Sequence, residues 1–247
     1  MSEMAEEHPT TRRFVFPRWT NYLLLIFVIG GVGAGLYAPV LVQLGASPRT
    51  LAVGYAPVQP VPFSHAQHAG QFGIDCRYCH VGVDKGPHST IPPTQTCMNC
   101  HSSLKTTAMQ QDPENPNAQV EVPNPNLAPV FNSWRSGKPV EWIRVHDLGD
   151  YAYFNHSAHV NRGVGCVSCH GRVDQMDVVF QAQPLSMAWC LDCHRAPEKH
   201  LRPLSEITNL AWKPPVGEQG EKLAQELKAQ YGIRDVAYMT SCSTCHR

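Results

Sequence analysis

The sequence has few charged residues and no excess of either sign. Only 16% of its 247 residues are Asp, Glu, Lys or Arg, against about 25% in an ordinary soluble domain. The 20 basic side chains balance 20 acidic ones, which excludes a charged disordered tail and a protein that binds nucleic acid through bulk charge. Proline and glycine are plentiful, with 21 and 18 residues, so irregular backbone is expected to be abundant.

The cysteines, unlike the charged residues, follow a regular pattern in this sequence. All ten cysteines occur as Cys-x-x-Cys pairs, and a histidine follows each pair at once. The cysteines are Cys76, Cys79, Cys97, Cys100, Cys166, Cys169, Cys190, Cys193, Cys242 and Cys245, and the histidines are His80, His101, His170, His194 and His246. Cys-x-x-Cys-His is the attachment signature of c-type haem, in which the histidine is the proximal iron ligand. The sequence therefore predicts five covalently bound haem c groups.

Zinc and disulfides are the alternatives for such pairs. Seventeen residues separate Cys79 from Cys97, and twenty separate Cys169 from Cys190, which also fits the four-cysteine spacing of a structural zinc ribbon. A histidine follows every pair, although only 13 of the 247 residues are histidine. This regularity favours haem over zinc or a disulfide framework.

An uncharged apolar run near the N-terminus predicts a transmembrane helix. Residues 22–44 contain no formal charge, and as a helix they would extend about 35 Å, enough to cross a bilayer. The run is longer than the apolar region of a cleaved signal peptide. Arg12, Arg13 and Arg18 favour a cytoplasmic N-terminal segment at 1–21, with the rest on the periplasmic side of a bacterial inner membrane. The Arg12-Arg13 pair leaves a twin-arginine export signal as an alternative.

One pattern occurs twice beyond a proline-rich stalk at residues 45–62. Residues 63–68 read Phe-Ser-His-Ala-Gln-His and residues 154–159 read Phe-Asn-His-Ser-Ala-His, and two haem motifs follow each. These offsets predict a duplicated dihaem module, at residues 63–101 and 154–194. A single C-terminal haem at residues 242–246 would complete one extracytoplasmic domain, residues 63–247.

Histidines outside the motifs are candidates for the second axial ligand of each haem. Two histidines three apart on one helical turn can reach two neighbouring haems. The predicted distal ligands are His65, His68, His156 and His159, with His146 as the first choice for the fifth haem and Met187 as its rival. His88 and His200 are expected at the surface, and His8 lies before the membrane span.

The repeated pattern followed by two motifs resembles the class III multihaem cytochromes. With one anchor, five motifs, Pro184-Leu185-Ser186-Met187 before Trp189-Cys190, and Ile91-Pro92-Pro93 before Cys97, the chain resembles the pentahaem subunits of bacterial alternative complex III. That resemblance implies a subunit of a membrane quinol:electron-acceptor oxidoreductase. Electrons from quinol would pass through an iron–sulfur partner and along these haems to a monohaem cytochrome c or a terminal oxidase, and polytopic membrane subunits would be further partners.

The expected fold is mainly α and irregular, with one transmembrane helix and a haem-organised domain with little sheet. Prolines disfavour helix and strand interiors in residues 103–141, whereas residues 218–231 predict a short amphipathic helix. No Cys-x-x-Cys-Lys variant or catalytic array stands out, so electron transfer without a substrate-turnover site is expected. A multihaem enzyme, a stand-alone membrane quinol dehydrogenase and a tethered electron shuttle remain the alternative functions.

Overall fold

The computed structural model describes residues 16–45 and 51–246. The chain divides into two units, residues 1–50 and residues 51–247. His8, Arg12, Arg13 and residues 46–50 of the expected stalk lie outside the described residues.

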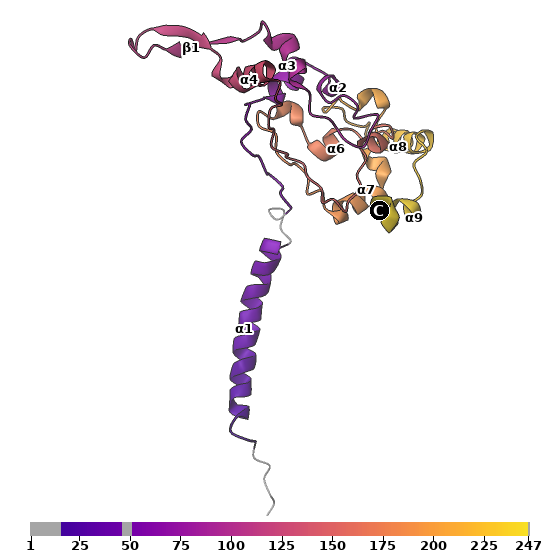
Figure 1. The fold of residues 1–247 in the computed structure, drawn as a ribbon. Coiled ribbons are helices and arrows are strands. Elements are labelled where there is room, and N and C mark those ends of the chain that lie inside the picture. Colours follow the sequence, from indigo (N-terminus) through magenta and orange to yellow (C-terminus); the bar gives the residue numbers. More distant parts are fainter. Residues whose placement is uncertain (1–15, 46–50, 247) are drawn as a thin grey trace, which may run out of the picture. The chain divides into compact units, whose positions relative to one another are not determined.

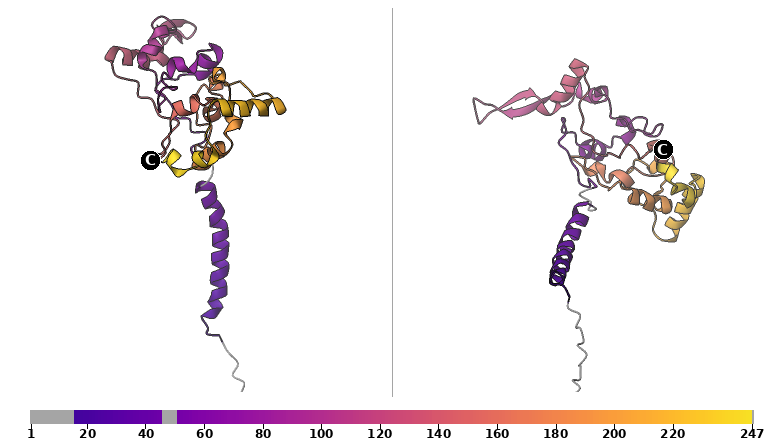
Figure 2. Two further views of the ribbon diagram at one scale, coloured as in Figure 1. Left: turned by 90° about the vertical axis from the view of Figure 1, so that its right-hand side faces the viewer. Right: turned by 60° about the horizontal axis from the view of Figure 1, so that its bottom comes forward.

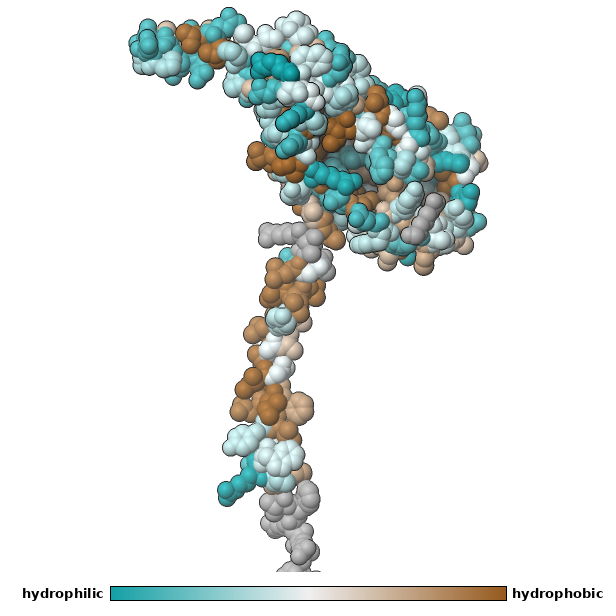
Figure 3. All heavy atoms as spheres, viewed as in Figure 1, coloured by the Kyte–Doolittle hydropathy of each residue, from teal (hydrophilic) through white to brown (hydrophobic). Residues whose placement is uncertain are grey.

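The first unit contains one long helix, α1 (Thr20–Gly45). It is 26 residues long with a mean hydropathy of 2.2, so its length and composition are sufficient to cross a membrane. Apolar side chains lie along its whole length (Figure 3), and none of them is buried. The helix extends slightly beyond the predicted 22–44, and its first N–H groups are satisfied by the preceding turn, because Thr20 N donates to the carbonyl of Pro17 at 3.0 Å and Asn21 N to that of Arg18 at 3.2 Å.

The second unit is built from short helices joined by long irregular segments (Figure 1), and one antiparallel hairpin is its only sheet within the described residues. The α-helices are α2 (Cys76–Cys79), α3 (Thr94–His101), α4 (Ala128–Ser136), α5 (His156–Val160), α6 (Val167–His170), α7 (Met187–Arg195), α8 (Glu218–Gln230), α9 (Val236–Met239) and α10 (Cys242–Cys245). A π-helical turn η1 (Ala66–Gln71) and the 3-10 turns η2 (Pro125–Leu127), η3 (Val173–Gln175), η4 (Pro197–His200) and η5 (Leu204–Glu206) complete it. The mainly α and irregular class is confirmed.

The expectation of irregular structure throughout residues 103–141 was wrong. Strand β1 (Thr107–Gln111) pairs with β2 (Gln119–Pro123) in a hairpin, with Thr107 opposite Pro123, and α4 follows. The prolines are compatible with these elements because of where they fall. Pro113 and Pro116 lie in the hairpin turn, and Pro129 lies in the first turn of α4, where no backbone N–H is needed.

The hydrophobic core of the second unit is small and lies around α8. Leu201, Leu227 and Tyr231 form a buried cluster, and Leu223 packs against it, which confirms the amphipathic helix expected at 218–231. Gly163 closes this cluster: its φ is +83°, and an added Cβ would stand 2.5 Å from the Tyr231 ring. Across all described residues only eight hydrophobic side chains are buried, and none of them is less than 2% exposed.

Candidate haem-binding site

Each Cys-x-x-Cys-His motif lies on a short helix or extends one residue past its end, at Cys166, His80 and His246. We name each motif by its histidine: the His80 motif on α2, the His101 motif on α3, the His170 motif on α6, the His194 motif on α7 and the His246 motif on α10. Residues three apart share one face of a helix, so both thiols of a motif point to the same side. All ten cysteines are free thiols, as covalent attachment to haem requires.

Four of the five motif histidines face one of the four histidines predicted as distal ligands. The ring centroids of His65 and His80 are 6.5 Å apart, and those of His68 and His101 are 6.2 Å apart. The second repeat gives 6.4 Å for His156 and His170 and 6.2 Å for His159 and His194. Two imidazoles that bind one iron from opposite sides, each with a metal–nitrogen bond of about 2 Å, would have centroids roughly 6 Å apart. The spacing therefore fits an axially coordinated haem iron in each pair.

Hydrogen bonds fix which ring nitrogen these histidines present. In seven of them Nδ1 lies 2.8–3.0 Å from a backbone carbonyl: His68, His80, His101, His156, His159, His194 and His246. A carbonyl only accepts, so Nδ1 carries the proton and Nε2 keeps its lone pair. This orientation, with a carbonyl on the outer nitrogen, is typical of metal-ligating histidine. Each of the seven rings is thus prepared to offer Nε2 to an iron.

Burial keeps the central imidazoles neutral, which is the form that binds metal. Removal from water lowers the pKa of His170 to about 3 and that of His65 to about 4, and the neighbouring histidines add to both effects. Nδ1 of His65 is buried without a hydrogen-bond partner, and so is Nε2 of His146. Burial also raises the pKa of the Cys169 thiol to about 12, so this sulfur is a neutral thiol before it is attached.

His146 does not lie opposite the fifth motif histidine. Its ring stands edge-on to His170 at 4.4 Å between centroids, beside a histidine that already faces His156. The ring of His246 instead has Tyr151 as its aromatic neighbour, at 6.1 Å. His146 is therefore near the centre of the second unit, and the structure brings no histidine ring opposite His246 within the described residues.

Comparison with known proteins agrees with this geometry. Residues 152–247 match the family described as "Cytochrome c7 and related cytochrome c". The chain carries a multihaem cytochrome c domain. It is also similar to the "Menaquinone reductase, multiheme cytochrome c subunit" of Nitratidesulfovibrio vulgaris, with 28% identity over 163 residues that cover 58% of this chain and 70% of the relative.

The family match covers only part of the multihaem cytochrome domain. It includes the His170, His194 and His246 motifs, and it leaves the His80 and His101 motifs outside. Those two motifs share the contacts of the matched part, because the pairs His65–His80 and His68–His101 have nearly the same centroid distances as the pairs of the second repeat.

Two phenylalanines have a positioning role that the sequence analysis did not assign. Phe63 contacts His65 edge-on at 4.8 Å and His68 face-on at 4.3 Å. Phe154 contacts His156 at 4.8 Å and His159 at 4.6 Å with the same two interplanar angles, 87° and 27°. Both occupy the first position of the repeated pattern, and that recurrence was the available signal. One aromatic ring therefore orients two histidines in each repeat.

Phe63→Ala is expected to loosen both histidines and to leave part of two haems high spin. Each aromatic contact contributes about 1 kcal/mol beyond area burial, so the high-spin fraction should rise severalfold by EPR. Phe154→Ala should do the same in the other repeat. Phe72→Ala is the matched control, because Phe72 touches only the edge of His68 at 6.2 Å and is largely exposed. Equal spectra for Phe63→Ala and Phe72→Ala would remove the positioning role.

Asp75 links the start of α2 to the rest of the domain. Its carboxylate accepts hydrogen bonds from Arg77 N at 2.8 Å, Arg77 Nε at 2.9 Å and Thr208 Oγ1 at 2.8 Å. The Arg77 side chain in particular lowers the pKa of Asp75 to about 2. The carboxylate therefore caps α2 and ties it to a segment 133 residues away.

Asp75→Asn keeps a capping oxygen but removes the charge, and it is expected to cost about 0.5–1 kcal/mol at neutral pH. Because the folded pKa lies below the unfolded value of 3.8, this stabilisation is present above pH 4 and is lost as the pH falls towards 2. Urea unfolding of wild type and Asp75→Asn, followed by circular dichroism at pH 7 and pH 3, checks it. If Asp75→Asn lowers the free energy of unfolding equally at pH 7 and pH 3, the charge of Asp75 is not the source of the stabilisation.

Proposed function

We propose that this chain is the electron-transfer subunit of a membrane quinol:electron-acceptor oxidoreductase of the alternative complex III type. The single observation that carries the proposal is the set of four histidine pairs with 6.2–6.5 Å between ring centroids. Histidine on both faces leaves an iron no open position, which suits electron transfer and not substrate turnover. Bound haem would supply a one-electron couple at each motif.

The proposed ligand set uses all five motifs. The ten motif cysteines would hold five haem c groups, and the motif histidines would bind the proximal face of each iron. His65 would be the distal partner of His80, His68 of His101, His156 of His170, and His159 of His194, so the first histidine of each repeat serves the first motif of that repeat. The duplicated modules at 63–101 and 154–194 would then be equivalent in their ligation.

The proposed setting is a bacterial inner membrane. Segment 1–21 would be cytoplasmic, 22–44 the membrane span, 45–62 a stalk and 63–247 the periplasmic domain. Support comes from the apolar helix α1, which is long enough to span a bilayer, and from the printed name of the relative, a subunit of a menaquinone reductase. Iron–sulfur and polytopic subunits would be its partners, and a monohaem cytochrome c or terminal oxidase would accept the electrons.

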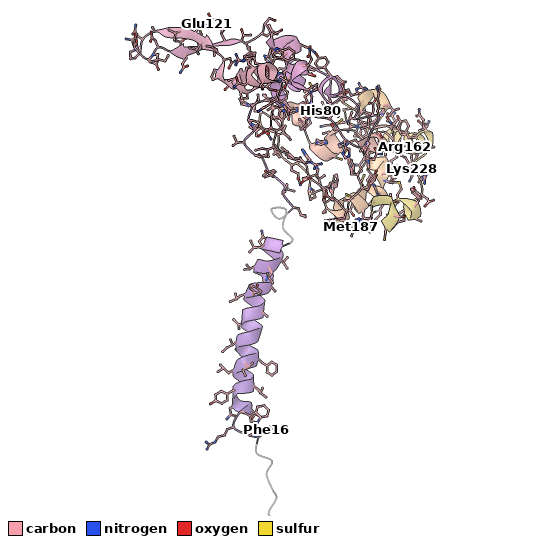
Figure 4. The ribbon with its side chains drawn as sticks, in the orientation of Figure 1. Phe16, His80, Glu121, Arg162, Met187 and Lys228 are labelled. Atoms are coloured by element: carbon pink, nitrogen blue, oxygen red, sulfur yellow. The ribbon has the colours of Figure 1, made fainter. Side chains whose placement is uncertain are left out.

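We assign Met187 instead of His146 as the distal ligand of the fifth haem. Met187 and Cys190 lie three apart on α7, and so share a face. α7 packs against α9, and Cys190 is near enough to Cys245 for the two sulfurs to influence each other. Met187 is exposed at the start of α7 (Figure 4). A His/Met haem would have a higher potential than the four bis-histidine haems.

Met187→Ala is therefore expected to turn the His246 haem high spin and to remove the spectral signature of sulfur ligation. His146→Ala is the matched variant, and all five haems should stay low spin in it. Magnetic circular dichroism of the oxidised proteins distinguishes the two. The opposite result, with a high-spin haem only in His146→Ala, would return the assignment to His146.

Delivery of electrons to menaquinone is the second candidate function. It is favoured by the printed name of the relative, which is a reductase of menaquinone and not an oxidase of quinol. The two candidates use the same haems in opposite directions. Reduction of the haems in the purified native complex by added menaquinol would support the first, whereas oxidation of prereduced haems by menaquinone, with no reduction by menaquinol, would support the second.

Purification from native membranes in mild detergent tests the proposal as a whole. Haem staining of the band, a pyridine haemochrome count of five and copurification of an iron–sulfur protein with polytopic subunits are expected. Five haems on a solitary chain would favour the tethered shuttle or the stand-alone quinol dehydrogenase. Fewer than five would overturn the assignment of the cysteine pairs.

A further inference from the structure

The segment that carries His65 and His68 docks on the other repeat. Ala66 N donates to the carbonyl of Met176 at 3.0 Å, and Ser64 Oγ donates to Asp177 Oδ1 at 2.6 Å. Gly70 approaches the carbonyl of Asp174 so closely that no Cβ would fit. The first pair of candidate distal ligands thus rests on residues 174–177, which directly follow the His170 motif.

The segment that carries His156 and His159 docks on the first repeat in the same way. His156 N and Ser157 N donate to the carbonyls of Pro87 and Gly86, both at 3.1 Å. Asn161 Nδ2 donates to the carbonyl of Asp84 at 2.8 Å. Residues 156–161 therefore rest on the loop that directly follows the His80 motif, and the two repeats dock crosswise as a pseudo-twofold pair.

This crosswise docking places the first motif of each repeat at the centre of the pair. The Cys76 and Cys166 sulfurs are electrostatic neighbours, so the His80 and His170 motifs meet there. The second motifs extend outward from this centre. On one side Asn99 Nδ2 donates to Tyr78 Oη at 3.0 Å and links the His101 motif to the His80 motif.

The fifth motif continues the other side of the pair. His194 Nδ1 donates to the carbonyl of Met239 at 2.8 Å, and Met239 ends α9, three residues before Cys242. Helices α7 and α9 pack together, and the Cys190 and Cys245 sulfurs are electrostatic neighbours. The His246 motif therefore lies next to the His194 motif, and it also contacts the segment before His156 through Tyr153 N, which donates to the carbonyl of Cys245 at 2.7 Å.

The exposure of the motif cysteines agrees with this arrangement of the motifs. Among the ten cysteines only Cys100 and Cys242 are exposed, one in the His101 motif and one in the His246 motif, whereas the other eight are half-buried. The two further views agree that α3, with the first of these motifs, and the C-terminal helices, with the second, lie at different ends of the domain (Figure 2).

We propose that the five motifs form one unbranched row in the order His101, His80, His170, His194, His246, with the motifs that carry the exposed Cys100 and Cys242 at its two ends. The inference rests on the proposed function, because it requires haem at every motif. Sequence order would have given a different row, beginning with the His80 motif.

Photoinduced electron injection from each end tests the order in the full-length haem-loaded protein. A ruthenium polypyridine donor is attached to one added thiol, either Ser103→Cys beside the His101 motif or Ala237→Cys on α9, both exposed positions. Three high-spin markers report arrival by transient absorption: His68→Ala at the His101 motif, His65→Ala at the His80 motif and His159→Ala at the His194 motif.

The two labels should report opposite orders. From position 237 the marker at the His194 motif should be reduced first, then the His80 marker and last the His101 marker, with at least a tenfold delay between first and last. With the label at position 103, the three markers should be reduced in the reverse order. The same order from both labels, or arrival at the His101 marker before the His80 marker from position 237, would overturn the row.

The haem count separates this inference from the proposed function. A pyridine haemochrome count below five, taken before any flash, overturns the proposed function, whereas a count of five with the wrong arrival order overturns the row alone. If a histidine variant does not mature, iron–iron distances from an electron cryomicroscopy map of the unmutated full-length protein decide the order. The His80 and His170 irons must then be mutual neighbours, and the His101 and His246 irons must be farthest apart.

Discussion

Replacing His156 with alanine is expected to turn one haem high spin and to leave the low-spin signals of the others unchanged. His156 faces His170 at 6.4 Å between ring centroids and donates from Nδ1 to the carbonyl of Pro87 at 2.9 Å. Its Nε2 is thus free for an iron, and no other described histidine lies across from His170 at this spacing. The loss of one strong-field axial ligand changes the spin state of that haem completely, and EPR of the oxidised protein measures it.

Matched variants separate ligation from general damage. His200→Ala removes a half-buried histidine outside the four pairs and should leave every haem low spin. His156→Met offers a different axial ligand and should restore a low-spin haem with a raised potential. An unchanged spectrum in His156→Ala would withdraw this residue from the ligand set and would weaken the assignment of His65, its equivalent in the other repeat.

Preventing haem attachment is expected to leave residues 51–246 without a stable fold. Only eight hydrophobic side chains are buried in the described residues, and only three of them, Leu201, Leu227 and Tyr231, form a cluster. So small a core cannot offset the conformational entropy of nearly two hundred residues. Porphyrin bound at the motifs would supply the missing apolar contact.

Limited proteolysis of the full-length chain in detergent measures this effect. The form made without haem attachment should be digested at least tenfold faster than the haem-loaded form, while α1 stays protected by the micelle. Removal of a single attachment pair, Cys242→Ala with Cys245→Ala, should give a smaller change, because that motif lies at an end of the row. A protease-resistant domain without haem would contradict the dependence of the fold on its cofactors.

The sequence predicted the elements that depend on local pattern. The apolar run gave α1 nearly to the residue, and the spacing of Leu223 and Leu227 gave α8. The histidines of the repeat were predicted as ligands because their spacing equals one helical turn. Those features need only neighbouring residues, so they can be read without knowledge of the fold.

Contacts between residues far apart in the sequence could not be predicted, because they depend on the fold of the whole domain. The choice between His146 and Met187 depends on which of them lies near His246 in the folded chain. Their positions in the sequence do not give that distance. The hairpin at 107–123 could not be predicted from the abundance of proline, because Pro113 and Pro116 lie in its turn, where they interrupt neither strand. Cys76 and Cys166 are electrostatic neighbours although they are 90 positions apart in the sequence, and the crosswise docking of the two repeats explains their proximity.

The crosswise docking of the two repeats also governs how the chain can be assembled. In the proposed periplasmic setting, His65 and His68 would leave the export channel about a hundred positions ahead of residues 174–177, on which their segment rests. The N-terminal half would then present its ligand-bearing turn before the second repeat supports it, and it would close only after that repeat has followed. The two repeats would therefore mature as a single unit.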